Sequence, residues 1–135
     1  MYSSVLVPFS FETGRDSKGA IEIAQSICAD KGEITLLHVV EHLPEYATSY
    51  FSKDFRKNQV FEMKAKLEDM ASGISGAATR LVEGHSGRTI FEFAKDNGSD
   101  CIVIASHRPG MADLLLGSTA THVVRHAPCS VHVIR

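Results

Sequence analysis

The sequence has few cysteines, no long hydrophobic run and almost no net charge, and each shortage excludes a class of protein. Its three cysteines are an odd number at wide spacings with no C-x-x-C pair, which argues against a disulfide framework and against a zinc site. No apolar run approaches the length that crosses a bilayer. A formal net charge of −2 leaves no basic footprint for nucleic acid or an anionic membrane.

The first residues also lack the features of a secretory leader. Met1-Tyr-Ser-Ser leads directly into Val5-Leu-Val7 without a basic segment, so we expect no signal peptide. Reduced, buried thiols, which the cysteine pattern favours, are typical of the cytoplasm. The sequence therefore predicts a cytoplasmic protein.

What is present is the composition of an ordinary globular domain, with 44% hydrophobic and 22% charged residues. A chain of 135 residues can bury about two-thirds of its unfolded surface. Repeats, low-complexity segments and linkers are absent from the sequence. We therefore expect a single domain over residues 1–135.

Short apolar runs alternate with segments of helical period along the chain. The runs predict strands over residues 4–8, 33–40, 78–83, 101–105 and 129–134. The helical segments run from about Ala20 to a stop at Gly32, then over 57–72, 87–97 and 118–126. In the second helix the stripe of Val60, Met63, Leu67 and Met70 is predicted to face the core.

This alternation predicts an α/β fold. Right-handed crossovers give an open five-stranded parallel sheet of order 3-2-1-4-5 with helices on both faces. The switch point then lies between the first and fourth strands, whose carboxyl ends are residues 8–10 and 105–108. A ligand belongs in that crevice.

The last 35 residues indicate which ligand. A strand, a loop and the helix start Gly117-Ser-Thr follow one another, and a helix amino end placed in this way attracts phosphate. Neither G-x-x-x-x-G-K-[ST] nor G-x-G-x-x-G is present. The residues alone therefore favour a nucleotide-binding domain without a standard phosphate loop.

The same segment resembles the carboxyl end of the universal stress protein family. The runs Ala105-Ser-His-Arg-Pro109, Leu115-Leu-Gly-Ser118 and Val123-Val-Arg-His-Ala127 are similar to its F/G subgroup. The ATP-binding branch has G-x-x-G and then G-[ST], and this chain departs from it with Ala105 and Arg108 at the two glycines. Ser10 replaces the acidic residue of the first strand. The resemblance implies the adenine nucleotide alpha hydrolase-like variant of the Rossmann-like fold.

The resemblance further implies an ATP-binding regulator or sensor of the stress response, with or without Mg²⁺. By position, Pro8 and Ser10 would line the nucleoside pocket and Val39 would contact adenine. The segment Ala105, Ser106, His107 and Arg108 would surround the ribose and phosphates, where Arg108 offers a charge-assisted bond. Gly117, Ser118 and Thr119 would cap the phosphates.

Two other interpretations of the function stay open. Gly84-His-Ser-Gly-Arg88 is one residue short of a nucleophile elbow, so Ser86 could serve a small hydrolase, although no triad is evident. A non-nucleotide interaction module of the same fold is the second. His122 and His126 have metal-binding spacing without a third ligand, so no metal site is predicted. Without a general base or P-loop lysine, we expect at most slow ATP hydrolysis or autophosphorylation.

Two segments predict self-association. Strand 129–134 is an apolar sheet edge without proline or lysine, so it is expected to pair with a second copy in a homodimer. Residues 42–56 lack a clean period and hold four of the ten aromatic residues. This segment is either a surface loop pinned by its own rings, or a lid or subunit contact that extends the dimer to a tetramer.

Overall fold

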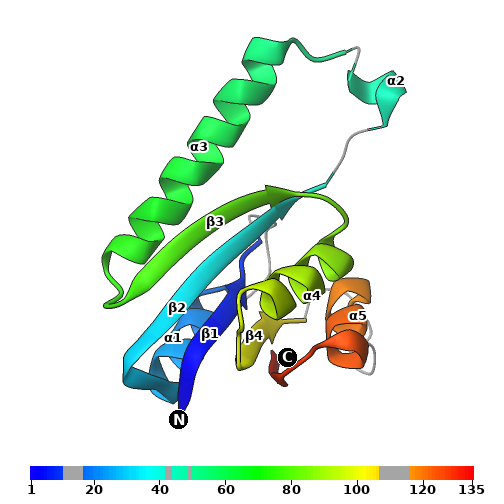
Figure 1. Cartoon of the computed structure of the whole chain (residues 1–135). Coiled ribbons are helices and arrows are strands. Elements are labelled where there is room, and N and C mark those ends of the chain that lie inside the picture. Colours follow the sequence, from blue (N-terminus) through cyan, green and yellow to red (C-terminus); the bar gives the residue numbers. More distant parts are fainter. Residues whose placement is uncertain (11–16, 42–43, 49, 107–115) are drawn as a thin grey trace.

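A computed structural model of the chain describes residues 1–10, 17–41, 44–48, 50–106 and 116–135. Within these residues five strands alternate with helices, as Figure 1 shows. The strands are β1 (Tyr2–Pro8), β2 (Cys28–Val40), β3 (Ala77–Glu83), β4 (Cys101–Ala105) and β5 (Ser130–Ile134). The helices are α1 (Ser17–Ile27), α2 (Glu45–Thr48), α3 (Lys53–Ser72), α4 (Ser86–Asp96) and α5 (Ser118–His126). None of them combines the length and the apolar character that a membrane-spanning helix needs.

The strands form one parallel sheet in the order β3-β2-β1-β4-β5, which confirms the predicted topology. The central strands are apolar on both faces: Leu6, Leu36, Leu37 and Ile102 have no exposed surface. Such strands are typical of a parallel sheet that helices cover on both sides. β1 pairs with β2 on one side and β4 on the other, so the switch point lies between β1 and β4.

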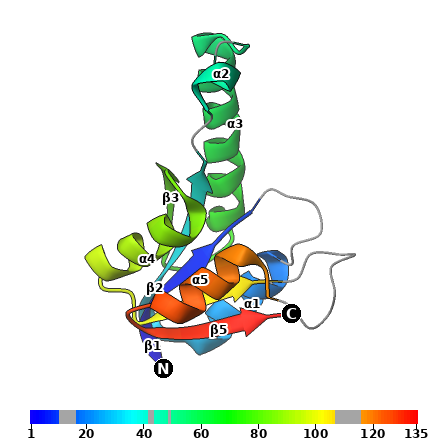
Figure 2. The same ribbon diagram turned by 90° about the vertical axis from the view of Figure 1, so that its right-hand side faces the viewer.

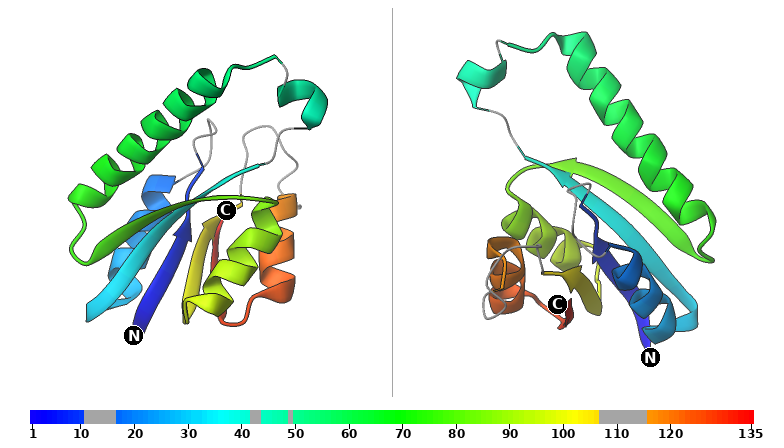
Figure 3. Two further views of the ribbon diagram at one scale, coloured as in Figure 1. Left: turned by 45° about the horizontal axis from the view of Figure 1, so that its top comes forward. Right: turned by 180° about the vertical axis from the view of Figure 1, so that it is seen from behind.

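Helices cover the sheet in two layers, which Figures 2 and 3 show from different sides. α1 and α3 lie over one face, where Ala20, Ala24 and Leu67 pack on Val5, Val7 and other residues of the sheet. α4 and α5 lie over the opposite face, where Ile90, Ala94, Ala120 and Val123 pack on Leu6, Ile102 and Ile104. The core is therefore two apolar layers separated by the sheet.

The predicted stop of the first helix at Gly32 is wrong. α1 ends at Ile27, and β2 begins at Cys28 with an irregular stretch, because the register shifts from Tyr2↔Cys28 to Ser4↔Glu33. A Cβ on Gly32 would lie 2.6 Å from the Cys28 sulfur and 3.0 Å from the Ser3 carbonyl oxygen. Gly32 thus permits close backbone packing inside a strand, a need that the sequence pattern does not separate from a helix end.

Helix α3 also differs from the helix predicted over residues 57–72. The predicted loop over 42–56 contains α2 and the start of α3, where the Ser52 side chain caps the helix by accepting from the Phe55 amide at 3.1 Å. Of the predicted core stripe, Leu67 is buried and Met63 and Met70 are half-buried, but Val60 is 40% exposed. The reason is visible in Figure 1, where the amino-terminal part of α3 rises away from the sheet.

Candidate functional site

A cavity of about 630 Å³ lies at the carboxyl ends of β1, β2 and β4, and we call it the switch-point cavity. Its wall includes Leu37, Val39, Ile90 and Ile104, which supply apolar surface. Glu41 is the one charged side chain, histidine aside, among the described residues that line it. The position agrees with the crevice expected for the ligand of a doubly wound sheet.

The chain that follows β1 is attached to its neighbours at this cavity. The Phe9 amide donates to the Leu37 carbonyl oxygen at 2.7 Å, and Nδ1 of His38 lies 2.9 Å from the Phe9 carbonyl oxygen. Because a carbonyl oxygen only accepts, this contact requires the proton on Nδ1 of His38. The Ser17 hydroxyl donates to the Ser10 carbonyl oxygen at 3.4 Å. These bonds connect the end of β1 to β2 and to the start of α1.

Three helices begin at the cavity, because Ser17, Ser86 and Ser118 are the first residues of α1, α4 and α5 and all line it. At α5, the N-cap residue Gly117 has φ −59° and ψ 157° and forms no side-chain cap. The amide N–H groups of the first turn of this helix are therefore left for other acceptors. A helix start of this kind favours an anion electrostatically.

Most of the predicted site residues lie together. Pro8, Ser10, Val39, Ala105, Ser118 and Thr119 all line the switch-point cavity. Gly117 lies beside it, where an added Cβ would be 3.3 Å from the Ser106 carbonyl oxygen. Ser106 is buried and directs its hydroxyl to the Ile134 carbonyl oxygen at 3.3 Å, so it also connects the end of β4 to β5. His107 and Arg108 lie outside the described residues.

The sequence interpretation omitted several residues that line the cavity. Glu41 directly follows β2, as the predicted end of that strand at Val40 already indicated. Met63 reaches the cavity from α3, and no pattern in the sequence identifies that contact. The remaining omissions are Phe9, Ser17, Leu37, His38, Val40, Ser86, Ile90 and Ile104.

Ser86, the candidate nucleophile of the hydrolase interpretation, has a carboxylate as its partner in the structure. The Ser86 hydroxyl donates to Oε1 of Glu41 at 2.8 Å. A serine triad instead places an imidazole on the hydroxyl to take its proton. Among the described residues, no imidazole hydrogen bond to Ser86 accompanies the bond to Glu41. The observed pair connects the end of β2 to the start of α4.

The histidines of α5 form a cluster with His85. The ring centroids of His122 and His126 are 4.5 Å apart, and those of His85 and His122 are 6.3 Å apart. Burial lowers the pKa of His122 below its usual value, and the positive charge on His126 or His85 would lower it further. In the part of the chain that the structure describes, no three His, Cys, Asp or Glu residues form a group that could hold a metal ion.

The fold and the cavity together define an α/β protein with a ligand crevice at the switch point of a doubly wound sheet. The family model named "Universal stress protein family" matches residues 1–135. The chain therefore belongs to the universal stress protein family.

Individual relatives agree with this assignment. Universal stress protein G of Shigella flexneri is 30% identical over 142 aligned positions, which cover all of both chains. Among solved structures, the universal stress protein UspA from Lactobacillus plantarum is 27% identical, with a TM-score of 0.71 and coverage of 99% of this chain and 98% of that one. The hypothetical protein MJ0577 has a TM-score of 0.82 at 24% identity, with coverage of 99% of this chain and 96% of that one.

Two further solved relatives hold nucleotides. One is a universal stress protein in complex with cAMP, with a TM-score of 0.65 at 21% identity. The other is a universal stress protein family protein from Arabidopsis thaliana with AMP bound, with a TM-score of 0.65 at 19% identity. At these identities the likeness to this chain is one of fold.

Proposed function

We propose that the switch-point cavity binds an adenine nucleotide, with ATP as the physiological ligand, and that the protein acts as a cytoplasmic stress-response regulator or sensor. One observation carries the proposal: Pro8, Ser10 and Val39 line the same cavity as Ser118 and Thr119 at the start of α5. The first set offers surface to a nucleoside. The second offers amide N–H groups and the positive end of a helix dipole to phosphates.

In this arrangement the base lies against Val39 and the other apolar side chains of the wall. The phosphates lie at Gly117, Ser118 and Thr119, where glycine lets the backbone approach closely. No lysine or arginine lines the cavity among the described residues. Phosphate binding by this part of the chain therefore rests on backbone N–H groups and hydroxyls, with Mg²⁺ as a further neutralising charge.

Any ATP hydrolysis or autophosphorylation at this site is slow. Glu41 is held by the hydroxyl of Ser86, and no lysine among the described residues that line the cavity stands where a phosphate loop would place one. A site with few groups to stabilise charge in the transition state supports at most slow hydrolysis or autophosphorylation. This suits a sensor, whose output is the bound state itself.

We assign the protein a homodimer as its working form. β5 is an edge of the sheet in the observed order, and an unpaired edge offers a row of N–H and C=O groups to a second copy. Antiparallel pairing across a twofold axis is an isologous contact, the commonest oligomer symmetry. Residues 42–56, with exposed Tyr46 and Tyr50, are the surface that would extend this dimer to a tetramer.

The direct test is the melting temperature of nucleotide-free protein with and without Mg-ATP. At a concentration 100 times its dissociation constant, a ligand adds about 2.7 kcal/mol to the free energy of unfolding, so a clear upward shift is expected. Gly117→Val should abolish the shift, because its methyl groups occupy the space of the phosphates.

Gly73→Val is the matched control. Gly73 has φ −87°, and nothing lies within 4 Å of an added Cβ there. This variant should keep the ATP-induced shift. A wild-type melting temperature that millimolar Mg-ATP leaves unmoved would reject the proposed function.

A further inference from the structure

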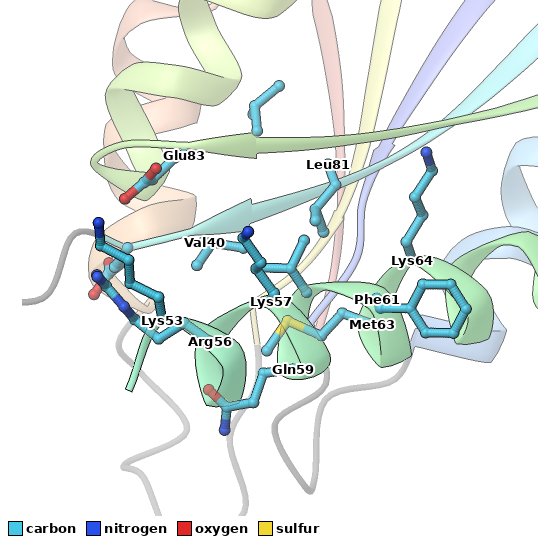
Figure 4. Close-up of a pocket in the computed structure, with 13 residues that line it drawn as sticks. Val40, Lys53, Arg56, Lys57, Gln59, Phe61, Met63, Lys64, Leu81 and Glu83 are labelled. Atoms are coloured by element: carbon cyan, nitrogen blue, oxygen red, sulfur yellow. The ribbon is translucent and has the colours of Figure 1, made fainter. Parts of the chain in front are cut away.

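A second cavity, of about 760 Å³, separates α3 from the carboxyl ends of β2 and β3, and we call it the α3 groove (Figure 4). On the sheet side its wall includes Val40, Leu81 and Val82. On the helix side it includes Val60 and Met63. Figure 4 shows Leu81 from the sheet pointing toward α3, on the side where Lys57 and Met63 lie. The groove thus has apolar surface on both sides.

The charged side chains by which α3 lines this groove are all cationic. Over residues 53–64, α3 carries four cations and two acidic residues. All four cations line the groove, namely Lys53, Arg56, Lys57 and Lys64, whereas neither Asp54 nor Glu62 does. With Glu41 and Glu83 the lining carries four positive and two negative groups, although the whole chain has a net charge of −2.

The groove exists because α3 contacts the sheet only toward its carboxyl end. Leu67 is the buried residue of this helix, and Met70 and Ala71 pack beside it on the same core. Val60, two turns earlier, is 40% exposed, and Phe61 is 74% exposed. An apolar wall that is left open to water is unfavourable unless something covers it.

We propose that the α3 groove binds an amphipathic carboxylate, such as a medium-chain fatty acid. Its hydrocarbon chain lies between Val60 and Met63 of α3 and Leu81 of β3, where burial of methylene groups drives binding. Its carboxylate lies against cations that α3 presents to the groove, among them Lys57 and Lys64. Binding in this groove does not require nucleotide in the switch-point cavity, with which it shares Met63.

The size of the groove is that of a small-molecule site. Lys53 and Lys64 are about 16 Å apart along α3 at 1.5 Å per residue. The volume of about 760 Å³ is within the range of small-molecule sites, about 300–1,000 Å³.

The test is calorimetric titration of the nucleotide-free protein with laurate below its micellar concentration. We expect saturable binding of one laurate per chain, and weaker binding of dodecanol, which has the same chain without the charge. Lys57→Gln/Lys64→Gln should weaken laurate about three- to tenfold, because two partly solvated charge contacts are lost. Lys18→Gln/Lys66→Gln, with two exposed lysines outside the groove, should bind as the wild type does.

A second pair of variants tests the apolar wall. Val60→Glu puts a carboxylate where the hydrocarbon chain lies and should weaken laurate by more than about tenfold. Val124→Glu makes the same change at a comparably exposed valine, 47% exposed on α5 and away from the groove, and should have no effect. Both replace exposed residues with a better helix former, so folding is expected to survive.

Three results would overturn the proposal. One is the absence of saturable laurate binding. Another is an equal affinity for laurate in Val60→Glu and Val124→Glu. The third is binding of an acidic helical peptide at the groove in place of laurate, which would assign the surface to a protein partner.

Discussion

At the scale of single residues, the two cysteines near β4 and β5 show how register decides chemistry. Both were expected to begin neighbouring strands, but β5 begins at Ser130, and it is Ser130 that pairs with Cys101. Successive side chains point to opposite faces of a sheet. Cys101 accordingly packs in the core layer under α1, whereas Cys129 packs with the layer under α4 and α5. The two thiols are thus close along the sheet but on different faces.

We expect native protein to keep these thiols reduced and to react at Cys129 well before Cys101. Cys101 is 1% exposed, and burial raises its pKa to about 11, with smaller contributions from Cys129 and Asp100. Since the thiolate is the nucleophile, a raised pKa leaves almost none of it at pH 8. Iodoacetamide labelling followed by peptide mass spectrometry measures the order. A disulfide, or Cys101 labelled first, would contradict it.

At the scale of elements, α4 and α5 cross closely because Gly87 has no side chain. A Cβ on Gly87 would lie 2.8 Å from Cβ of His122. This approach brings His122 of α5 within 6.3 Å, between ring centroids, of His85 at the start of α4. Helix packing therefore depends on a histidine for which protonation is unfavourable.

We predict that this helix pair makes stability fall as the pH drops from 7.5 to 5.5. The pKa of His122 is lowered in the folded state, first by burial and then by His126 and His85. The unfolded chain, with a pKa of about 6.5, therefore binds the proton at a higher pH than the folded chain does. The contribution of neutral His122 to the free energy of unfolding is full above the unfolded pKa and is lost as the pH falls below it. His122→Gln should reduce the difference between melting temperatures at the two pH values, and an unchanged difference would refute the assignment.

Along the edge strand β5, the backbone N–H and C=O groups point alternately toward β4 and toward the free edge of the sheet. The Ile134 carbonyl oxygen accepts from the Ser106 amide, so Ile134 directs its backbone groups toward β4. His132, two residues earlier on the same strand, pairs with Val103 in the register of β5 on β4 and directs its backbone groups to the same side as Ile134. Because backbone groups alternate along a strand, Val131 and Val133 direct theirs to the free edge. These are the amides that a second copy would use.

This assignment predicts different effects for two proline variants. Val131→Pro removes an edge-facing donor and should convert a dimer to a folded monomer, because an edge strand tolerates proline where no bond is made inside the sheet. His132→Pro removes a donor within the sheet and should destabilise the fold itself. Light scattering and thermal melting separate the two outcomes. A wild-type mass near the 14.7 kDa of one chain at micromolar concentration would end the dimer proposal.

At the scale of the whole molecule, two cavities adjoin at the carboxyl end of β2. Val40, Glu41 and Met63 line both the switch-point cavity and the α3 groove. A ligand in either cavity therefore contacts side chains that shape the other. Any effect of one ligand on the affinity for the second must be reciprocal, so the laurate and ATP titrations, each repeated with the other ligand present, measure one coupling free energy.

The arrangement of the sheet followed from the sequence alone. Five apolar runs separated by helical periods leave few topologies, because parallel strands need crossovers and these are right-handed. The switch point, and the gathering of Pro8, Ser10, Val39, Ala105, Ser118 and Thr119 at one cavity, then follow from strand order. A pattern of local period is sufficient here because every residue involved lies at the end of a strand or the start of a helix.

Contacts between elements required the tertiary structure. The bond between Ser86 and Glu41 joins residues 45 positions apart, the close approach of Gly32 to Ser3 occurs at a register shift, and the separation of α3 from the sheet exposes Val60. Periodicity states which face of an element is apolar, but not how closely another element packs on it. Register and packing distance are set by the whole core at once, so only the folded chain decided them.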